Sequence, residues 1–265
     1  MAIDATARIH PMAVIDEGAQ IGSGVSIGPF SVIGPKVKLA EGVVVKSHVV
    51  ITGDTEIGND TVIFPFAVIG EIPQDLKFHG EDTKLVIGAR NRIREHVTIN
   101  PGTEGGGGIT SLGDDCLLMA GVHVAHDCRV GNRVILVNNV GVAGHCHIGD
   151  DVIIGGISGV HQWVRIGQGA IIGGLSKVEK DVIPFGMVQG DAGRLVGLNL
   201  IGLKRRGLER IDIAELRAAY KALAAEGGTF RERAEALGAA SDSEYVRAIV
   251  EFITGESDRS FLQPE

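Results

Sequence analysis

Aliphatic residues recur at every sixth position over most of the chain. One run extends from Ile3 to Ile69 and a second from Leu112 to Val178, each with an aliphatic residue at all twelve steps, and a short run within 87–99 keeps the phase of the first. Such a repeat predicts a short strand followed by a turn. Three strands would complete a triangular coil of eighteen residues, and stacked coils would pair at about 4.8 Å and bury their inward side chains against each other.

Two further positions of the repeat are restricted. Counting the aliphatic residue as the first, the fifth position is small or β-branched and holds all three cysteines, Cys116, Cys128 and Cys146. We therefore expect three free thiols packed inside the coils. The second position is often glycine, and we expect it to form a bend with positive φ. These glycines are Gly22, Gly28, Gly34, Gly58, Gly131, Gly149, Gly167 and Gly173.

Two segments interrupt the repeat. Residues 70–86 and 100–111 lack the aliphatic spacing, and we expect both to loop out of the coils. The second segment contains four successive glycines at 105–108, without the strand before or the Lys-Ser/Thr after that a phosphate-binding loop needs. We expect these glycines to form a flexible surface loop, although long loops on rigid scaffolds often contact ligands.

The pattern changes near residue 190. The chain is predicted to be mainly β over residues 1–190 and to end in a small α-helical domain at 191–265, with residues 190–197 as a linker. Apolar residues at helical spacing and three pairs with capping-box spacing predict the helices. The pairs are Asp212 with Glu215, Thr229 with Glu232, and Ser241 with Glu244.

Composition excludes several classes of protein. Aromatic residues make up 4% of the chain, so the core has to be aliphatic. The formal net charge of -8 argues against general nucleic-acid binding, which needs a basic face. The N-terminal sequence shows no signal-peptide pattern, and no run of about 18 apolar residues predicts a transmembrane segment. An odd number of cysteines fits a reducing compartment, so we expect a cytoplasmic protein.

The eighteen-residue coil predicts which histidines come together. His145 follows His126 by one coil plus one residue, and His161 follows His126 by two coils minus one residue. We therefore expect the three histidines near one edge of the prism on successive coils. Gly144 and Gln162 lie whole steps of eighteen from His126. The two histidines that align less well are His123 and His147.

Three histidines on one edge allow more than one function. A catalytic zinc ion binds three protein ligands and keeps an open position. Alternatively, one imidazole could act in acid–base catalysis while its neighbours orient the substrate. Solvated turn histidines are the third possibility. Asp127 follows His126 and could fix its tautomer, but adjacent residues in a strand point to opposite faces, so this pair needs a turn or a neighbouring subunit.

Several longer motifs are more specific than the repeat. They are IGPFSVIGP (27–35), KSHVVI (46–51), PQDLKFHGEDT (73–83), RNRIREHVTIN (90–100), VHVAHDCRVGN (122–132), AGH (143–145), VHQW (160–163) and GLKRRG (202–207). In these motifs the chain resembles the UDP-N-acetylglucosamine O-acyltransferases, a family of hexapeptide-repeat enzymes. The resemblance covers about residues 3–225 and implies a left-handed parallel β-helix.

The resemblance also implies a reaction and a set of site residues. Family members are homotrimers with active sites between neighbouring β-helices. They move a (R)-3-hydroxyacyl group from acyl carrier protein to the 3-position of UDP-N-acetylglucosamine, the first step of lipid A biosynthesis. The matching positions imply that His126 is the general base, Asp127 its partner and Gly144 the oxyanion donor. Substrate contacts are implied for Gln74, Asp75 and Lys77 (sugar nucleotide), His145, His161 and Gln162 (sugar), and Asn199, Arg205 and Arg206 (nucleotide end).

Two positions concern the length of the acyl chain. Gly174 matches the position that limits chain length, and Ala192 stands where family members commonly have His. Ile201 replaces a common Glu near the nucleotide. The preferred chain length and the acceptor group, a 3-hydroxyl or a 3-amino group, stay open. The resemblance implies neither a metal nor a cofactor, because the thioester drives the reaction, and direct attack on it is more economical than an acyl-enzyme.

Other classes of function are compatible with the repeat alone. The γ-class carbonic anhydrases share the fold and would use the three histidines to bind zinc. A noncatalytic β-helix scaffold would not require the GLKRRG segment and the first loop together. The later N-acyltransferase of the same pathway typically carries a separate domain before its repeats, whereas here the repeats begin at Ile3.

Overall fold

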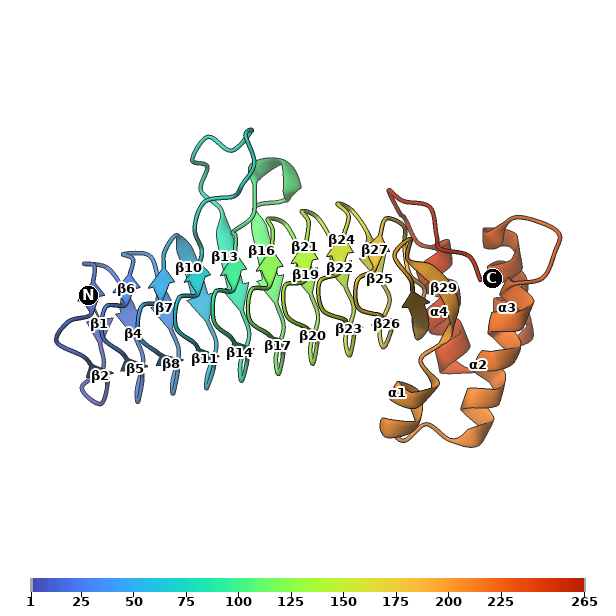
Figure 1. Cartoon of the computed structure of the whole chain (residues 1–265), viewed down its shortest axis with the longest axis horizontal. Helices are drawn as coiled ribbons and strands as arrows, with labels where there is room; N and C mark the ends of the chain where they lie inside the picture. Colours follow the sequence, from blue (N-terminus) through green and yellow to red (C-terminus); the bar gives the residue numbers. More distant parts are fainter. Residues whose placement is uncertain (1, 265) are drawn as a thin grey trace.

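The repeat forms a stack of three-sided coils followed by a group of helices (Figure 1). The computed structural model describes residues 2–264. Most strands contain two residues, the sixth position of one repeat and the first of the next, and the first-position side chain is the buried one, as in Gln20–Ile21. Strands pair in parallel one coil apart, so that Ile21 lies beside Leu39. The fold is the predicted left-handed parallel β-helix of hexapeptide repeats.

Three sheets form the sides of the prism, and we call them sheets I, II and III. Sheet I contains β1 (Ala2–Ile3), β4 (Gln20–Ile21), β7 (Lys38–Leu39), β10 (Asp54–Ile57), β13 (Lys84–Ile87), β16 (Ile109–Leu112), β19 (Arg129–Val130), β22 (His147–Ile148) and β25 (Arg165–Ile166). Sheet II contains β2 (Arg8–Ile9), β5 (Ser26–Ile27), β8 (Val44–Val45), β11 (Val62–Ile63), β14 (Arg92–Ile93), β17 (Leu117–Leu118), β20 (Ile135–Leu136), β23 (Ile153–Ile154), β26 (Ile171–Ile172), β28 (Gly186–Gln189) and β29 (Arg194–Leu198). Sheet III contains β3 (Val14–Ile15), β6 (Val32–Ile33), β9 (Val50–Ile51), β12 (Val68–Ile69), β15 (Thr98–Ile99), β18 (His123–Val124), β21 (Gly141–Val142), β24 (Gly159–Val160) and β27 (Lys177–Val178).

Each coil turns three corners, which we name by the sheets they join: I–II, II–III and III–I. The residue with positive φ at a corner is the fourth of the repeat, as at Asp127 (59°) and His145 (62°). The second-position glycines have no positive φ, so our expectation for them was wrong. They are small because the next coil is close: a Cβ on Gly149 would lie 2.6 Å from the backbone nitrogen of Gln168.

The interior is aliphatic, as the composition requires. The first-position side chains are buried throughout the central coils, and the fifth-position residues fill the space between them. Cys116, Cys128 and Cys146 are buried free thiols, which confirms their expected packing role. Each inward side chain contacts the coils above and below, so the core continues along the prism.

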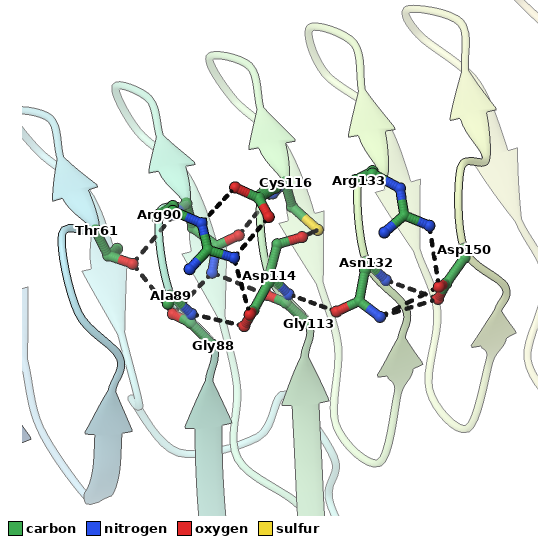
Figure 2. A network of polar contacts seen from close by, with 12 residues as sticks. Thr61, Gly88, Ala89, Arg90, Gly113, Asp114, Cys116, Asn132, Arg133 and Asp150 are labelled. Carbon is green, nitrogen blue, oxygen red and sulfur yellow. Dashed lines mark hydrogen bonds and ion pairs between the residues drawn. The ribbon is translucent and has the colours of Figure 1, made fainter. Parts of the chain in front are cut away.

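Corner I–II is polar and carries a ladder of hydrogen bonds and ion pairs between coils (Figure 2). Asn132 accepts a hydrogen bond from the backbone nitrogen of Asp114 at 2.9 Å and donates from its own backbone nitrogen to Asp150. Arg90 and Arg133 form ion pairs with the aspartates of the following coil. The charged groups are exposed or partly exposed, so the ladder mainly satisfies the hydrogen-bonding groups of the turns and each ion pair adds little stability.

Both interruptions leave the prism at corner III–I. The first connects β12 to β13 and the second connects β15 to β16, and both project from the same side of the stack in Figure 1. Each is shorter than expected, because β13 already begins at Lys84 and β16 at Ile109. The second contains one turn of 3-10 helix, Glu104–Gly106.

Four helices follow the last strands: α1 (Leu200–Arg205), α2 (Arg210–Leu223), α3 (Phe230–Ala240) and α4 (Glu244–Thr254). The expected linker at 190–197 is wrong in part, because β29 pairs antiparallel with β28. No helix within residues 2–264 has the length and apolar character needed to cross a membrane.

One of the three expected capping boxes is present. Thr229 and Glu232 cap α3 reciprocally. Helix α2 begins one turn earlier than expected and is capped by Glu209 and Asp212, so the pairing of Asp212 with Glu215 was wrong. Ser243 rather than Ser241 precedes α4, so the third pair was wrong as well.

The close approach of coils at second positions predicts an asymmetry between two glycines. Gly149→Ala should destabilise the protein by about 1–3 kcal/mol, because its Cβ meets the backbone of the next coil. Gly159→Ala is the control, since a Cβ there meets nothing within 4 Å, and it should shift stability by less than about 1 kcal/mol. Thermal unfolding of both variants measures the difference. Equal losses would refute the account of the second position.

Candidate active site

Corner III–I collects most of the residues expected at the site. A hollow of about 340 Å³ lies there, and its lining includes His126, Gly144 and Gln162 from three successive coils. Gln74 from the first loop closes one side. The eighteen-residue spacing therefore brings His126, Gly144 and Gln162 to one hollow within one chain, as predicted.

His126 and Asp127 form a buried pair. Nδ1 of His126 lies 2.8 Å from Oδ2 of Asp127, and the two residues are 7% and 3% exposed. The pair needed a turn, and the left-handed conformation of Asp127 supplies it. Because a carboxylate only accepts hydrogen bonds, the proton of His126 is on Nδ1 and Nε2 is free to accept a proton.

The second loop holds the carboxylate of Asp127. Thr103 donates to it twice, from the backbone nitrogen at 2.8 Å and from Oγ1 at 2.6 Å. Thr110 accepts a hydrogen bond from the backbone nitrogen of Asp127 at 2.7 Å. Gly106 lies so close to the carboxylate that a Cβ there would overlap it. The tetraglycine segment is therefore more than the expected free surface loop, since one of its members covers Asp127.

His145 packs beside this pair on the next coil. Its Nδ1 lies 3.7 Å from Oδ2 of Asp127, and its ring meets that of His126 edge to face at 4.9 Å. The indole of Trp163 stacks flat on His145 at 3.8 Å from the following coil. Burial lowers the pKa of His145, although the charge of Asp127 opposes the shift. His145 is thus held next to the His126–Asp127 pair by its packing between the rings of His126 and Trp163.

His123 also lines the hollow, although it lies on sheet III outside the corner column of His126, Gly144 and Gln162, as expected. It points outward from sheet III, and its Nδ1 lies 2.7 Å from Oγ1 of Thr98. Gly141 follows it in the same column of β-strand residues and leaves room above the sheet. Burial, followed by the nearby His126, lowers the pKa of His123.

The three-histidine zinc site considered above is not the cluster that forms. Among residues 2–264, the potential ligands that converge here are His126, Asp127 and His145, with ligand atoms within 4.8 Å of one another. His161 is not in this group. Asp127 Oδ2 already accepts hydrogen bonds from His126 and Thr103, so the geometry favours a hydrogen-bonded acid–base group over a metal centre.

The remaining candidates around corner III–I are on the surface. Asp75 lies close enough to His145 that its negative charge partly opposes the lowering of the His145 pKa by burial. The side chain of Asp75 also accepts a hydrogen bond from the backbone nitrogen of Lys77. His161 is exposed, and its ring contacts Arg259 from the C-terminal tail.

Other expected site residues lie elsewhere in the chain. Asn199 is buried: its amide donates to the carbonyl of Gly169 and caps α1. Arg206 packs against Gly169 at corner I–II, and Arg205 is exposed beside it. The positions tied to acyl-chain length and to family departures are also remote from His126. Gly174 is at corner II–III, Ala192 lines a separate hollow with Lys180 and Phe261, and Ile201 is exposed.

Comparison with known proteins identifies the family. The profile described as Udp N-acetylglucosamine O-acyltransferase, Domain 2, matches residues 181–262, and that of the bacterial transferase hexapeptide matches residues 18–53 and 109–144. A curated acyl-[acyl-carrier-protein]--UDP-N-acetylglucosamine O-acyltransferase from Rhizobium etli is 51% identical over 263 residues, 99% of this chain and 97% of its own length. The chain belongs to the UDP-N-acetylglucosamine O-acyltransferase family.

Other relatives agree with this membership. The acyl-[acyl-carrier-protein]--UDP-N-acetylglucosamine O-acyltransferase of Paracoccus denitrificans is 63% identical over 203 residues, 77% of each chain. The solved structure of the UDP-N-acetylglucosamine acyltransferase from Campylobacter jejuni is 38% identical, covers 97% of this chain and 99% of its own, and has a TM-score of 0.91. The protein is accordingly an acyltransferase.

Sequence reasoning missed several residues of this candidate site. Thr103 and Gly106 lie in an insertion, where the eighteen-residue arithmetic does not apply. Trp163 is one coil from His145 and could have been found by the same arithmetic. For His123 the available indication was glycine at the equivalent strand position of the following coil, Gly141, which leaves a hollow next to its side chain.

The contact between Gly106 and Asp127 predicts a loss of turnover. Gly106→Ala should displace the carboxylate or the loop and lower kcat by about ten- to a hundredfold, because small displacements of catalytic groups are costly. Gly105→Ala is the matched control, since a Cβ there meets nothing within 4 Å, and it should keep parental turnover. Steady-state acyl transfer by both variants, with thermal unfolding to verify folding, makes the comparison. Equal kcat values would show that Gly106 does not hold Asp127.

Proposed function

We propose that this chain transfers a (R)-3-hydroxyacyl group from acyl carrier protein to the 3-oxygen of UDP-N-acetylglucosamine, the first step of lipid A biosynthesis. The observation that best supports it is the His126–Asp127 pair, whose free Nε2 faces Gly144 within the hollow. The family membership supplies the substrate classes. Buried free thiols fit a reducing compartment, so we place the reaction in the cytoplasm.

His126 is the general base of the proposed mechanism. Nε2 takes the proton of the acceptor hydroxyl while the oxygen attacks the thioester carbonyl, and Asp127 stabilises the imidazolium that forms. When the tetrahedral intermediate collapses, the carbon–sulfur bond breaks and the proton on Nε2 passes to the departing thiolate. The products are the O-acyl ester and the free thiol. His126 returns to its starting state because it has given up the proton that it took.

Gly144 stabilises the oxyanion of the intermediate. No group within residues 2–264 accepts a hydrogen bond from its backbone N–H. A side chain is excluded there, because a Cβ would lie 2.8 Å from Nε2 of His126. The N–H is therefore beside the base and fixed before negative charge develops.

We propose direct transfer without an acyl-enzyme or a cofactor. A nucleophilic cysteine needs an accessible thiolate. Cys128 and Cys146 are fully buried, and burial raises the pKa of the Cys116 thiol to about 11. Asp127 and His126 also supply the acid–base chemistry without a metal ion.

The proposed site is completed by neighbouring chains of a homotrimer. The expected residues of one chain are divided among its corners: His126 at III–I, Gly174 at II–III, and Asn199, Arg205 and Arg206 beside I–II. Corner II–III exposes an unusual column of apolar and aromatic residues, in which Phe30, His48, Phe66 and His96 stack ring on ring. Packing this corner against corner III–I of a neighbour would bury the column and bring the edge that carries Gly174 of one chain against the edge that carries His126 of the next.

An acyl chain fits the later coils of corner II–III. Gly156 and Gly174 stack in one column without side chains. Beside them Ile157 and Leu175 are 64% and 66% exposed, although both are apolar. The strip is therefore lined by glycine backbone and by aliphatic side chains, which an acyl chain could cover. This lining supports the assignment of Gly174 to the acyl groove.

The experiment that tests the proposed function is a substrate panel. The purified enzyme is incubated with acyl carrier proteins bearing chains of several lengths and with acceptors carrying a 3-hydroxyl or a 3-amino group. We expect a 3-O-acyl product from (R)-3-hydroxyacyl donors, identified by mass and fragmentation. Acylation of the amine alone, or of another sugar position, would contradict the proposal.

Removal of the base should slow the reaction strongly. His126→Ala is expected to lower kcat by about 10²–10⁴, the usual contribution of a general base, with a modest change in acceptor KM. His161→Ala should mainly raise acceptor KM, with a smaller loss of kcat. Steady-state kinetics separates the two. Near-parental turnover of His126→Ala would remove it from the mechanism, and reversed effects would reassign the base.

A side chain at Gly174 should shorten the preferred acyl chain. The residue has no positive φ, and a Cβ would lie 3.2 Å from the carbonyl oxygen of Gly156, so Gly174→Met requires only a small adjustment. We expect the optimum to shift by several carbons, since each buried methylene contributes about 0.8 kcal/mol. Activity with short donors is the folding control. Unchanged activity with long donors would show that Gly174 does not line the groove.

A further inference from the structure

The C-terminal tail returns from the helices to the β-helix. After α4, residues 256–264 run back beside the last coils, and Phe261 packs against Phe230 and Phe252. Asp181 is buried at this junction: its backbone nitrogen donates to the carbonyl of Ser260, and its carbonyl accepts from the nitrogen of Leu262. The tail is thus hydrogen-bonded to the coil that follows the site.

Arg259 extends from this tail to corner III–I. Its Nη2 lies 2.6 Å from Nδ1 of His161, and its Nε donates to the carbonyl oxygen of Gln162 at 2.9 Å. The backbone of Arg259 is itself fixed, because its nitrogen donates to Oγ of Ser257, which donates to the buried carboxylate of Asp181. One guanidinium therefore contacts two successive residues at the edge of the hollow.

The contact determines the tautomer of His161. A guanidinium only donates hydrogen bonds, so Nδ1 of His161 is the acceptor and the ring proton is on Nε2. In this state the imidazole presents an N–H donor on the side away from Arg259. The bond to the Gln162 carbonyl also fixes the turn from which the Gln162 side chain enters the hollow.

We propose that Arg259 is a positioning residue for the acceptor sugar, acting through His161 and the backbone of Gln162. The proposal rests on the proposed function, in which these two residues line the sugar site. The planar fork of arginine suits a contact with two acceptors, one on a ring and one on the backbone. The contact is on the surface, so its loss should affect substrate binding far more than folding.

The test combines four variants with a spectroscopic measurement. They are Arg259→Ala, Arg259→Lys, His161→Ala and the double variant Arg259→Ala/His161→Ala. Arg247→Ala is the matched control, because Arg247 lies on α4 and its guanidinium donates to the carbonyl of Asp242, just before that helix, rather than to a residue of corner III–I. KM for UDP-N-acetylglucosamine and kcat are measured for each, and ¹⁵N NMR of the parent and Arg259→Ala reports the tautomer of His161.

Arg259→Ala should raise acceptor KM about tenfold, the effect of losing a hydrogen bond to a charged group, with kcat within about twofold of the parent. Arg259→Lys should recover part of this loss, because one ammonium reaches one of the two acceptors. In the His161→Ala background, Arg259→Ala should raise KM by at most about threefold, since most of its effect passes through the imidazole. The NMR spectrum should show His161 protonated at Nε2 in the parent and a mixture of tautomers without Arg259.

Two kinds of result would overturn the proposal, and they are distinguishable. If His161→Ala raises KM but Arg259→Ala does not, or if the two effects simply multiply, Arg259 does not position the site and the proposed function stands. If His161→Ala itself leaves KM unchanged, the role of His161 in sugar binding fails, and the positioning role of Arg259 fails with it. A His161 ring proton on Nδ1 in the parent would exclude the contact in solution, because Nδ1 could not then accept from Arg259.

Discussion

The hydrogen bonding of each coil to the next is the constraint on which the rest of the structure depends. Backbone groups pair eighteen residues apart wherever no insertion intervenes, as between Gln20 and Lys38, so a residue's number determines its side and its coil. The same stacking brings backbones so close at second positions that side chains are excluded, and it places a left-handed residue at the fourth position of the corners. Three corners of different chemistry result: a polar ladder, an apolar column and a histidine edge.

The histidine edge is a candidate site because a hydrogen-bonded carboxylate and a loop lie next to His126. A buried carboxylate is stable only when its oxygens are hydrogen-bonded, and Asp127 satisfies this with Thr103 and His126. The loop that supplies Thr103 leaves the prism at the same corner, so the insertion that breaks the repeat also completes the pair. The rigid coils fix the column from His126 to Gln162, and the irregular segments provide the groups that orient it.

The repeat made much of this predictable from sequence. Step counting placed His126, Gly144 and Gln162 in one column, and the fifth position correctly assigned the cysteines to the core. Two kinds of feature could not be predicted from the repeat. Thr103 and Gly106 lie in an insertion without a register, and Arg259 meets His161 across 98 residues through the packing of helices whose arrangement no spacing encodes. The second-position glycines were predicted for the wrong reason. The sequence shows that glycine is preferred there, but the cause is the close backbone of the next coil and not a positive φ.

The central claim is that His126 removes the proton from the 3-hydroxyl of the acceptor sugar. A crystal structure of the enzyme with UDP-N-acetylglucosamine tests this most directly. The account predicts the 3-oxygen within about 2.6–3.2 Å of Nε2 of His126, with Asp127 still bonded to Nδ1. A 3-oxygen outside the reach of His126, directly or through one water, and next to another titratable side chain such as His145 would contradict it.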